Sequence, residues 1–190
     1  MHSCVVPLEP PPSRIERPWT SNRLVVFLDY DGVLHRGDAF RTRQGIVSSD
    51  PKRIKLFEFA DVLNELLAPY PHVELVLATS WVKVLGFNEA RDAMPLAELR
   101  KRVRGATYHS RFDDAHLWNG VPRGQQILRY VARHRLVHWL AIDDRADGFG
   151  DYAGHLVRCD LDQGLGDVVV QGRLQAALCM QFGSHETRAD

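Results

Sequence analysis

Residues 24–34 read Leu24-Val25-Val26-Phe27-Leu28-Asp29-Tyr30-Asp31-Gly32-Val33-Leu34, an apolar run that ends in two aspartates and a glycine. A short run rich in Val, Phe and Leu is typical of a parallel strand that is buried on both faces. Residues i and i+2 of a strand point the same way, so we expect Asp29 and Asp31 to lean together at its carboxyl end. Neighbouring carboxylates repel each other unless a cation or a shared proton lies between them. The segment therefore predicts a charged site at a strand end.

The composition is that of an ordinary globular protein, with 190 residues, 45% hydrophobic and 25% charged. The 24 Lys and Arg residues balance 24 Asp and Glu residues, so the net charge predicts neither nucleic-acid nor membrane binding. The basic cluster at residues 100–104 is interpreted first as a solvated helix face. Three scattered cysteines without metal-ligand spacing, and the lack of a signal-like apolar segment, favour a cytoplasmic location.

Apolar strands and amphipathic helices alternate along the chain, which predicts an α/β fold with a mainly parallel sheet covered on both faces. We expect strands at 24–28, 73–78, 137–142 and 156–159, and helices at 50–68, 95–103, from 122 onward, and at 168–180. Residues 35–49 are predicted to form a loop or short hairpin over the carboxylates, a partial lid too short to be a cap domain. Residues 1–21 are predicted to be a flexible Pro-rich leader, 22–180 the folded domain, and 181–190 a flexible tail.

The strong strands all end in small polar or acidic residues. Thr79-Ser80 follows the second predicted strand, and Asp143-Asp144 follows the third. Ligands of open α/β sheets bind beyond the carboxyl ends of the strands, so these residues are expected to converge with Asp29 and Asp31. Four carboxylates form a hard-oxygen site, which suits Mg²⁺ better than zinc.

Three segments resemble motifs of the haloacid dehalogenase-like (HAD) phosphohydrolases. Phe27–Leu34 is similar to the first motif, Leu77-Ala78-Thr79-Ser80 to the second, and Ala141-Ile142-Asp143-Asp144 to the acidic fourth. The resemblance extends from about Leu24 to Leu178 and implies a Rossmann-like three-layer sandwich with a minimal cap or none, so that 22–180 would be a HAD-like catalytic domain. Its implied activity is that of a Mg²⁺-dependent phosphatase.

A narrower likeness concerns the small HAD domains associated with bacterial RNA-repair proteins. It is carried by Thr79-Ser80-Trp81, by Ile142-Asp143-Asp144-Arg145 and by the late pair Gly164-Leu165. With a minimal cap, a large phosphorylated substrate such as a nucleic-acid end or a protein is physically possible.

The resemblance assigns roles residue by residue. Asp29 would attack phosphorus and form an aspartyl-phosphate, and Asp31 would protonate the leaving oxygen and then activate water. Thr79 would hydrogen-bond a phosphate oxygen, with Ser80 as the fallback. Both hydroxyls also suit a simple helix-capping role.

The metal site implied by the resemblance uses Asp29, the Tyr30 carbonyl oxygen and Asp143 as Mg²⁺ ligands, with Asp144 in support. Asp31 is included among the four candidate metal carboxylates because it leans toward the same site.

The third motif of the family is usually a lysine, and here the sequence departs from it. Arg123, just before a predicted helix, is the first candidate, since a guanidinium can bind phosphate bidentately. Lys83 is the second. Trp81 is interpreted as a core residue and His35 as a loop residue.

Two other functions remain open. A non-catalytic binding or regulatory module on the same scaffold is the main alternative, although it would not need both Asp29 and Asp31. Nucleic-acid end repair is the other, with the basic cluster at residues 100–104 holding the backbone, in which case binding would weaken steeply with salt.

Overall fold

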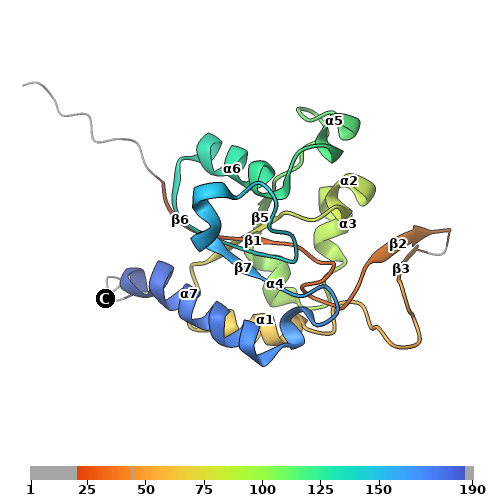
Figure 1. The fold of residues 1–190 in the computed structure, drawn as a ribbon, viewed down its shortest axis with the longest axis horizontal. Coiled ribbons are helices and arrows are strands. Elements are labelled where there is room, and N and C mark those ends of the chain that lie inside the picture. Colours follow the sequence, from red (N-terminus) through yellow and green to blue (C-terminus); the bar gives the residue numbers. More distant parts are fainter. Residues whose placement is uncertain (1–20, 44, 187–190) are drawn as a thin grey trace, which may run out of the picture.

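A five-stranded parallel sheet in the order β5-β4-β1-β6-β7 forms the centre of the molecule (Figure 1). The structure is a computed structural model that describes residues 21–43 and 45–186; residues 1–20 of the predicted leader lie outside them. The strands are β1 Ser21–Leu28, β4 Glu74–Leu77, β5 Val103–Ala106, β6 Leu136–Asp143 and β7 Leu156–Arg158. This arrangement confirms the predicted α/β class with its parallel sheet.

Helices cover both faces of this sheet. They are α1 Ala60–Leu67, α2 Trp81–Leu85, α3 Phe87–Asp92, α4 Ala97–Arg102, α5 Ala115–Asn119, α6 Arg123–His134 and α7 Val168–Glu186. On one face Val26 and Leu28 of β1 belong to a core that includes residues of α1 and α7, while Val25 and Phe27 pack with residues of α6 on the other. Alternate residues of β1 thus enter opposite cores, and the fold is the three-layer sandwich that the resemblance implies.

The segment between β1 and α1 contains a short antiparallel hairpin, as predicted for residues 35–49. Its strands are β2 Ala39–Thr42 and β3 Gly45–Ser48. The hairpin extends away from the sheet in Figure 1, and the Arg41 guanidinium donates to the Val84 carbonyl oxygen of α2 at 2.8 Å. A role as a lid over the carboxylates stays a prediction.

The first helix begins later than the sequence predicts. Residues around Asp50 form a turn closed by the Ile54 N–H on the Asp50 carbonyl oxygen at 2.8 Å, and α1 starts only at Ala60. Phe57 has a φ of +60°, which a right-handed helix cannot include. The predicted helix over 50–68 is therefore wrong in its first half.

Strand β5 is absent from the prediction because Val103-Arg104-Gly105-Ala106 lacks an apolar run. Gly105 pairs with Val76 of β4. A Cβ at this position would lie 2.7 Å from the Tyr130 hydroxyl, so the glycine lets α6 pack closely on the sheet.

The last helix continues to Glu186, past the predicted end at Met180. Phe182 is completely buried and its ring packs edge-on against Tyr70, with 6.4 Å between centroids. Residues 181–186 therefore belong to α7 rather than to the predicted tail, and residues 187–190 of that tail lie outside the described residues.

Candidate active site

The predicted site residues of three strands meet at one edge of the sheet. Leu28 of β1 pairs with Leu77 of β4 on one side and with Ile142 of β6 on the other. The residues that follow these positions are therefore neighbours, which brings Thr79, Asp29 and Asp143 together beyond the strands. The sheet order, with β1 between β4 and β6, produces the convergence that the sequence predicts.

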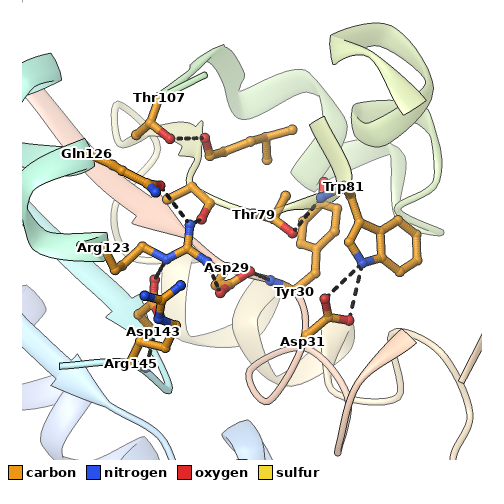
Figure 2. Close-up of polar contacts among 12 residues, drawn as sticks. Asp29, Tyr30, Asp31, Thr79, Trp81, Thr107, Arg123, Gln126, Asp143 and Arg145 are labelled. Atoms are coloured by element: carbon orange, nitrogen blue, oxygen red, sulfur yellow. Dashed lines mark hydrogen bonds and ion pairs between the residues drawn. The ribbon is translucent and has the colours of Figure 1, made fainter. Parts of the chain in front are cut away.

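Three carboxylates form a compact group at this edge. Asp29, Asp143 and Asp144 each offer an oxygen within 4.8 Å of the others. Asp29 and Asp143 are buried, and Asp144 is half-buried. Asp31, the fourth predicted metal carboxylate, is not a member of this group and points to another side of the site (Figure 2).

Burial and mutual repulsion destabilise the charged forms of these acids. The pKa of Asp29 is raised to about 6, chiefly by burial and also by the charges of Asp31 and Asp144, while Arg123 opposes the rise. The pKa of Asp143 is raised well above its ordinary value by burial and by Asp29, and burial raises the pKa of Asp144 as well. A bound cation would relieve this repulsion.

The residues fit a hard divalent cation. The donors are all carboxylate oxygens, the ligands that Mg²⁺ prefers. Asp143 Oδ2 is buried and makes no hydrogen bond among the described residues, although Arg123 Nε lies 2.9 Å away without the alignment of one. This oxygen is therefore available as a ligand.

Arg123 lies between the two buried aspartates. Its Nη2 donates to Asp29 Oδ2 at 2.8 Å, and its Nη1 donates to the carbonyl oxygen of Ala78 and, at 3.3 Å, to Gln126 Oε1. Nε lies beside Asp143 as an ion pair without a hydrogen bond, so only one of the five N–H groups, on Nη2, has neither a hydrogen bond nor an ion-pair partner among the described residues. Bidentate phosphate binding, the reason for choosing Arg123 from sequence, therefore requires an exchange of partners.

Backbone contacts fix where Arg123 stands. It is the first residue of α6, and its N–H donates to Asp147 Oδ2 at 3.0 Å. The next N–H, of Gly124, donates to the Asp147 carbonyl oxygen at 2.8 Å. A Cβ at Gly124 would lie 2.4 Å from the Gly148 backbone, so only glycine permits this approach of helix and loop. The contact holds the start of α6 against the loop after β6.

Thr79, Ser80 and Lys83 line a polar cavity of 80 Å³ together with Arg123. Thr79 is buried and its hydroxyl oxygen accepts the Trp81 N–H at 3.3 Å, so Thr79 also stabilises the start of α2; Ser80 is exposed. Lys83 is half-buried and donates to Asn119 Oδ1. Both candidate cations thus line one cavity, with Arg123 buried and Lys83 half-buried.

Arg145 also lines this cavity, although the sequence interpretation used it only as part of a motif. Its exposed guanidinium is paired with Asp147, at 2.8 Å between Nη2 and Oδ2. Its place directly after Asp143-Asp144 was the signal in the sequence that could have identified Arg145 as a site residue.

Asp31 has two partners that the sequence interpretation missed. Trp81 Nε1 lies 3.2 Å from both carboxylate oxygens (Figure 2). His35 Nε2 lies 3.1 Å from Oδ1. His35 lies in the segment between β1 and β2, as the sequence predicts for a loop residue, but its side chain is completely buried. Its position four residues after Asp31 was the signal that could have suggested the contact.

The basic cluster at residues 100–104 does not lie at this edge. Arg102 donates to the carbonyl oxygens of Leu67, Tyr70 and Val73, which precede β4, and Arg100 donates to those of Met94 and Pro95. Arg102 thus binds the loop that enters β4 at the amino edge of the sheet, whereas Arg100 binds the carbonyl oxygens that precede α4. The cluster is therefore badly placed to hold a substrate for Asp29.

None of the helices within residues 21–43 and 45–186 is long and apolar enough to cross a membrane.

Comparison with known proteins supplies a family. A model of the HAD domain in Swiss Army Knife RNA repair proteins matches residues 25–170. Neither the comparison with curated proteins nor that with solved structures found a match. The matched residues make up most of the chain and contain β1, β4 and β6 with the acidic group. The chain therefore belongs to this family of HAD domains, as the sequence motifs predict.

Proposed function

We propose that this protein is a Mg²⁺-dependent phosphatase that forms an aspartyl-phosphate on Asp29. The observation that carries the proposal is the convergence of Asp29, Asp143 and Asp144 beside Arg123, on a HAD fold. Buried carboxylates with raised pKa values, gathered at a ligand-binding edge, are the kind of group expected at a catalytic site.

The proposed reaction has two halves. An Asp29 oxygen attacks phosphorus, the bond from phosphorus to the leaving oxygen breaks, and Asp31 gives its proton to that oxygen, so that an alcohol leaves. Asp31, now a carboxylate, then takes a proton from water as the water oxygen attacks the aspartyl-phosphate. Inorganic phosphate leaves, and Asp29 and protonated Asp31 are restored.

The other residues bind and orient. The remaining Arg123 N–H and the Thr79 hydroxyl are proposed to bind phosphate oxygens, because both line the cavity beside Asp29. Lys83, which also lines the cavity, adds positive charge. A bound Mg²⁺ held by Asp29, Asp143 and Asp144 would neutralise charge on the transferring phosphoryl group.

The substrate class is proposed to be a large phosphate ester, such as a phosphorylated nucleic-acid end. Two observations support this: the insertion after β1 is only a short hairpin in the described part of the chain, and the family is named for RNA repair proteins. Lys83 and Arg145 at the cavity, rather than residues 100–104, are the proposed contacts to a polyanion.

The experiment that tests the proposal is phosphate release from p-nitrophenyl phosphate and from phosphorylated oligonucleotide ends, with Mg²⁺ and with EDTA. Asp29→Asn should abolish release, while Asp162→Asn, an exposed acid outside the site, is the matched control. Unchanged turnover by Asp29→Asn, or undiminished activity in EDTA, would contradict the proposal. Tight partner binding without turnover of any phosphate would favour the non-catalytic module instead.

A further inference from the structure

The residues around Asp31 are arranged so that they could orient its carboxyl group for the proposed proton transfer. We propose that His35 and Trp81 are positioning residues that fix the orientation of the Asp31 carboxyl group, so that Oδ2 carries the proton to the leaving oxygen. This inference rests on the proposed function, in which Asp31 is the acid.

Three contacts define the orientation. Trp81 Nε1–H lies 3.2 Å from Oδ1 and 3.2 Å from Oδ2, and His35 Nε2 lies 3.1 Å from Oδ1. Oδ1 therefore has two donors, while Oδ2 has only a share of the indole N–H. An oxygen that already accepts two hydrogen bonds is the poorer place for a proton, so the acidic hydrogen belongs on Oδ2.

The two donors are held rigidly by packing. His35 is completely buried and Trp81 is 4% exposed. Phe57 packs edge-on against both, with ring centroids 5.7 Å from His35 and 5.3 Å from Trp81, and Tyr30 packs against Trp81 at 5.4 Å. In such a close-packed aromatic cluster the donors cannot turn away without displacing their neighbours.

The environment of His35 also assigns its hydrogen. Nδ1 is buried and has no partner among the described residues. An N–H at Nδ1 would be buried there without an acceptor, which is costly. The tautomer with its hydrogen on Nε2 is therefore favoured, and this N–H donates to Asp31 Oδ1.

The chain reaches this geometry through a tight turn after β1. Gly32 has a φ of +66°, and its N–H donates to the Gly37 carbonyl oxygen at 3.1 Å. The backbones of Asp31 and His35 form an isolated bridge across the turn. A Cβ at Gly32 would lie 3.0 Å from Asp144 Cβ, so the glycine is needed for space as well as for conformation. The turn thus returns His35 to the acid that precedes it by four residues.

The test compares two substrates that differ in their need for an acid. A p-nitrophenolate leaves readily without a proton, whereas the alkoxide of glycerol 2-phosphate does not. The value of kcat/KM reports the first half-reaction only, so the later role of Asp31 as a base does not enter. His35→Phe and Trp81→Phe keep a ring but remove the donor, and His35→Gln keeps a donor.

The expected result is a selective loss. Asp31→Asn should lower kcat/KM for glycerol 2-phosphate roughly 100-fold more than for p-nitrophenyl phosphate, and His35→Phe and Trp81→Phe roughly tenfold more. His35→Gln should restore most of the selectivity. Phe57→Leu disturbs the same ring cluster without touching Asp31 and should lower both values alike.

Other results would overturn the inference in distinguishable ways. Equal losses on both substrates in His35→Phe and Trp81→Phe would mean that these residues only support the fold, while the proposed function stands. Full activity of Asp29→Asn would instead remove the proposed function.

A second measurement does not depend on turnover. The chain has four tryptophans, and Trp81→Phe identifies the Trp81 indole signal in a ¹H–¹⁵N NMR spectrum. Asp31→Ala should move that signal upfield because its acceptor is lost, and His35→Phe should move it by less. An unmoved indole signal in Asp31→Ala would show that the hydrogen bond is absent and would end the inference.

Discussion

Asp29 and Asp31 are separated by one residue, yet their carboxylates lie in different surroundings. Asp29 faces Arg123, Asp143 and Asp144, a group of charges whose balance depends on a cation. Asp31 faces the indole of Trp81 and the imidazole of His35, which are hydrogen-bond donors held by aromatic packing. The first environment suits a nucleophile beside a metal, and the second suits a group that gains and loses a proton. The difference shows how one Asp-x-Asp motif can supply two roles.

The largest expected effect concerns which aspartate variant can still form the aspartyl-phosphate intermediate. Asp29→Asn should reduce activity to background because it lacks the attacking oxygen. Asp31→Asn should still be phosphorylated by p-nitrophenyl phosphate, but hydrolysis of the aspartyl-phosphate should slow by roughly 10²-fold or more without its base. Mass spectrometry of acid-quenched protein should therefore find a phosphorylated Asp31→Asn variant and an unmodified Asp29→Asn variant. A phosphate on Asp29→Asn would reverse the assignment.

Removal of the buried cation should produce the next largest effect. Arg123→Met leaves Asp29 and Asp143 buried without their ion-pair partner. We expect the free energy of unfolding in EDTA to fall by roughly 3–5 kcal/mol, measured by urea denaturation. Mg²⁺ should restore part of this loss. A variant as stable as the wild type would show that the acids are neutral in the metal-free protein.

The binding of Mg²⁺ should distinguish the two environments directly. An ion that binds the folded state alone raises the free energy of unfolding by about 2.7 kcal/mol at one hundred times its dissociation constant. Asp143→Asn should abolish this increase, whereas Asp31→Asn, outside the acidic group, should keep it. Thermal unfolding with and without Mg²⁺ is the measurement. If Asp31→Asn lost the Mg²⁺-dependent increase in the free energy of unfolding, Asp31 would have to be counted among the metal ligands.

Acidification of the metal-free protein should increase the contribution of Asp29 to the free energy of unfolding. The pKa of Asp29 is raised from 3.8 to about 6, so between these values the folded state binds more protons than the unfolded state. Its contribution to stability is fully present below pH 4 and is lost as the pH rises through about 6, by on the order of 2 kcal/mol. The difference in unfolding free energy between wild type and Asp29→Asn, followed from pH 7.5 to 4.5, should show this slope. A difference that is constant with pH would contradict it.

The smallest expected effect concerns the aromatic residues packed around Asp31. Phe57→Leu should lower the free energy of unfolding by about 1 kcal/mol through lost ring packing with Tyr30 and Trp81. The loss should be the same at pH 5 and 7.5 and the same with and without Mg²⁺, because no charge is involved. A strong dependence on Mg²⁺ would mean that the two environments are coupled.

The sheet and the acidic group were predictable because their signals are local. Buried strands such as β1 are apolar runs, and the strand ends carry Asp29, Thr79 and Asp143 in the chain itself. Parallel pairing then brings these ends together, whatever the details of the loops.

The partners of Asp31 were not predictable in the same way. Trp81 looks like a core residue in the sequence, and it is buried, yet its one polar atom donates to a site residue fifty positions earlier. Which way an indole points depends on packing that no short pattern encodes. The first half of the predicted helix over 50–68 failed for a related reason. Phe57 has a positive φ and packs against Tyr30, a contact between distant residues that local propensity does not encode.

The close contact between Gly124 and Gly148 has a consequence for variation among related sequences. Neither residue has a side chain, and neither performs chemistry, yet together they set the distance from α6 to the acidic edge. A larger residue at either position would displace the start of α6 and move the guanidinium of Arg123 away from Asp29. Relatives that carry another residue in place of Arg123 are therefore expected to differ at Gly124 and Gly148 as well. A comparison of function among relatives should examine these three positions together.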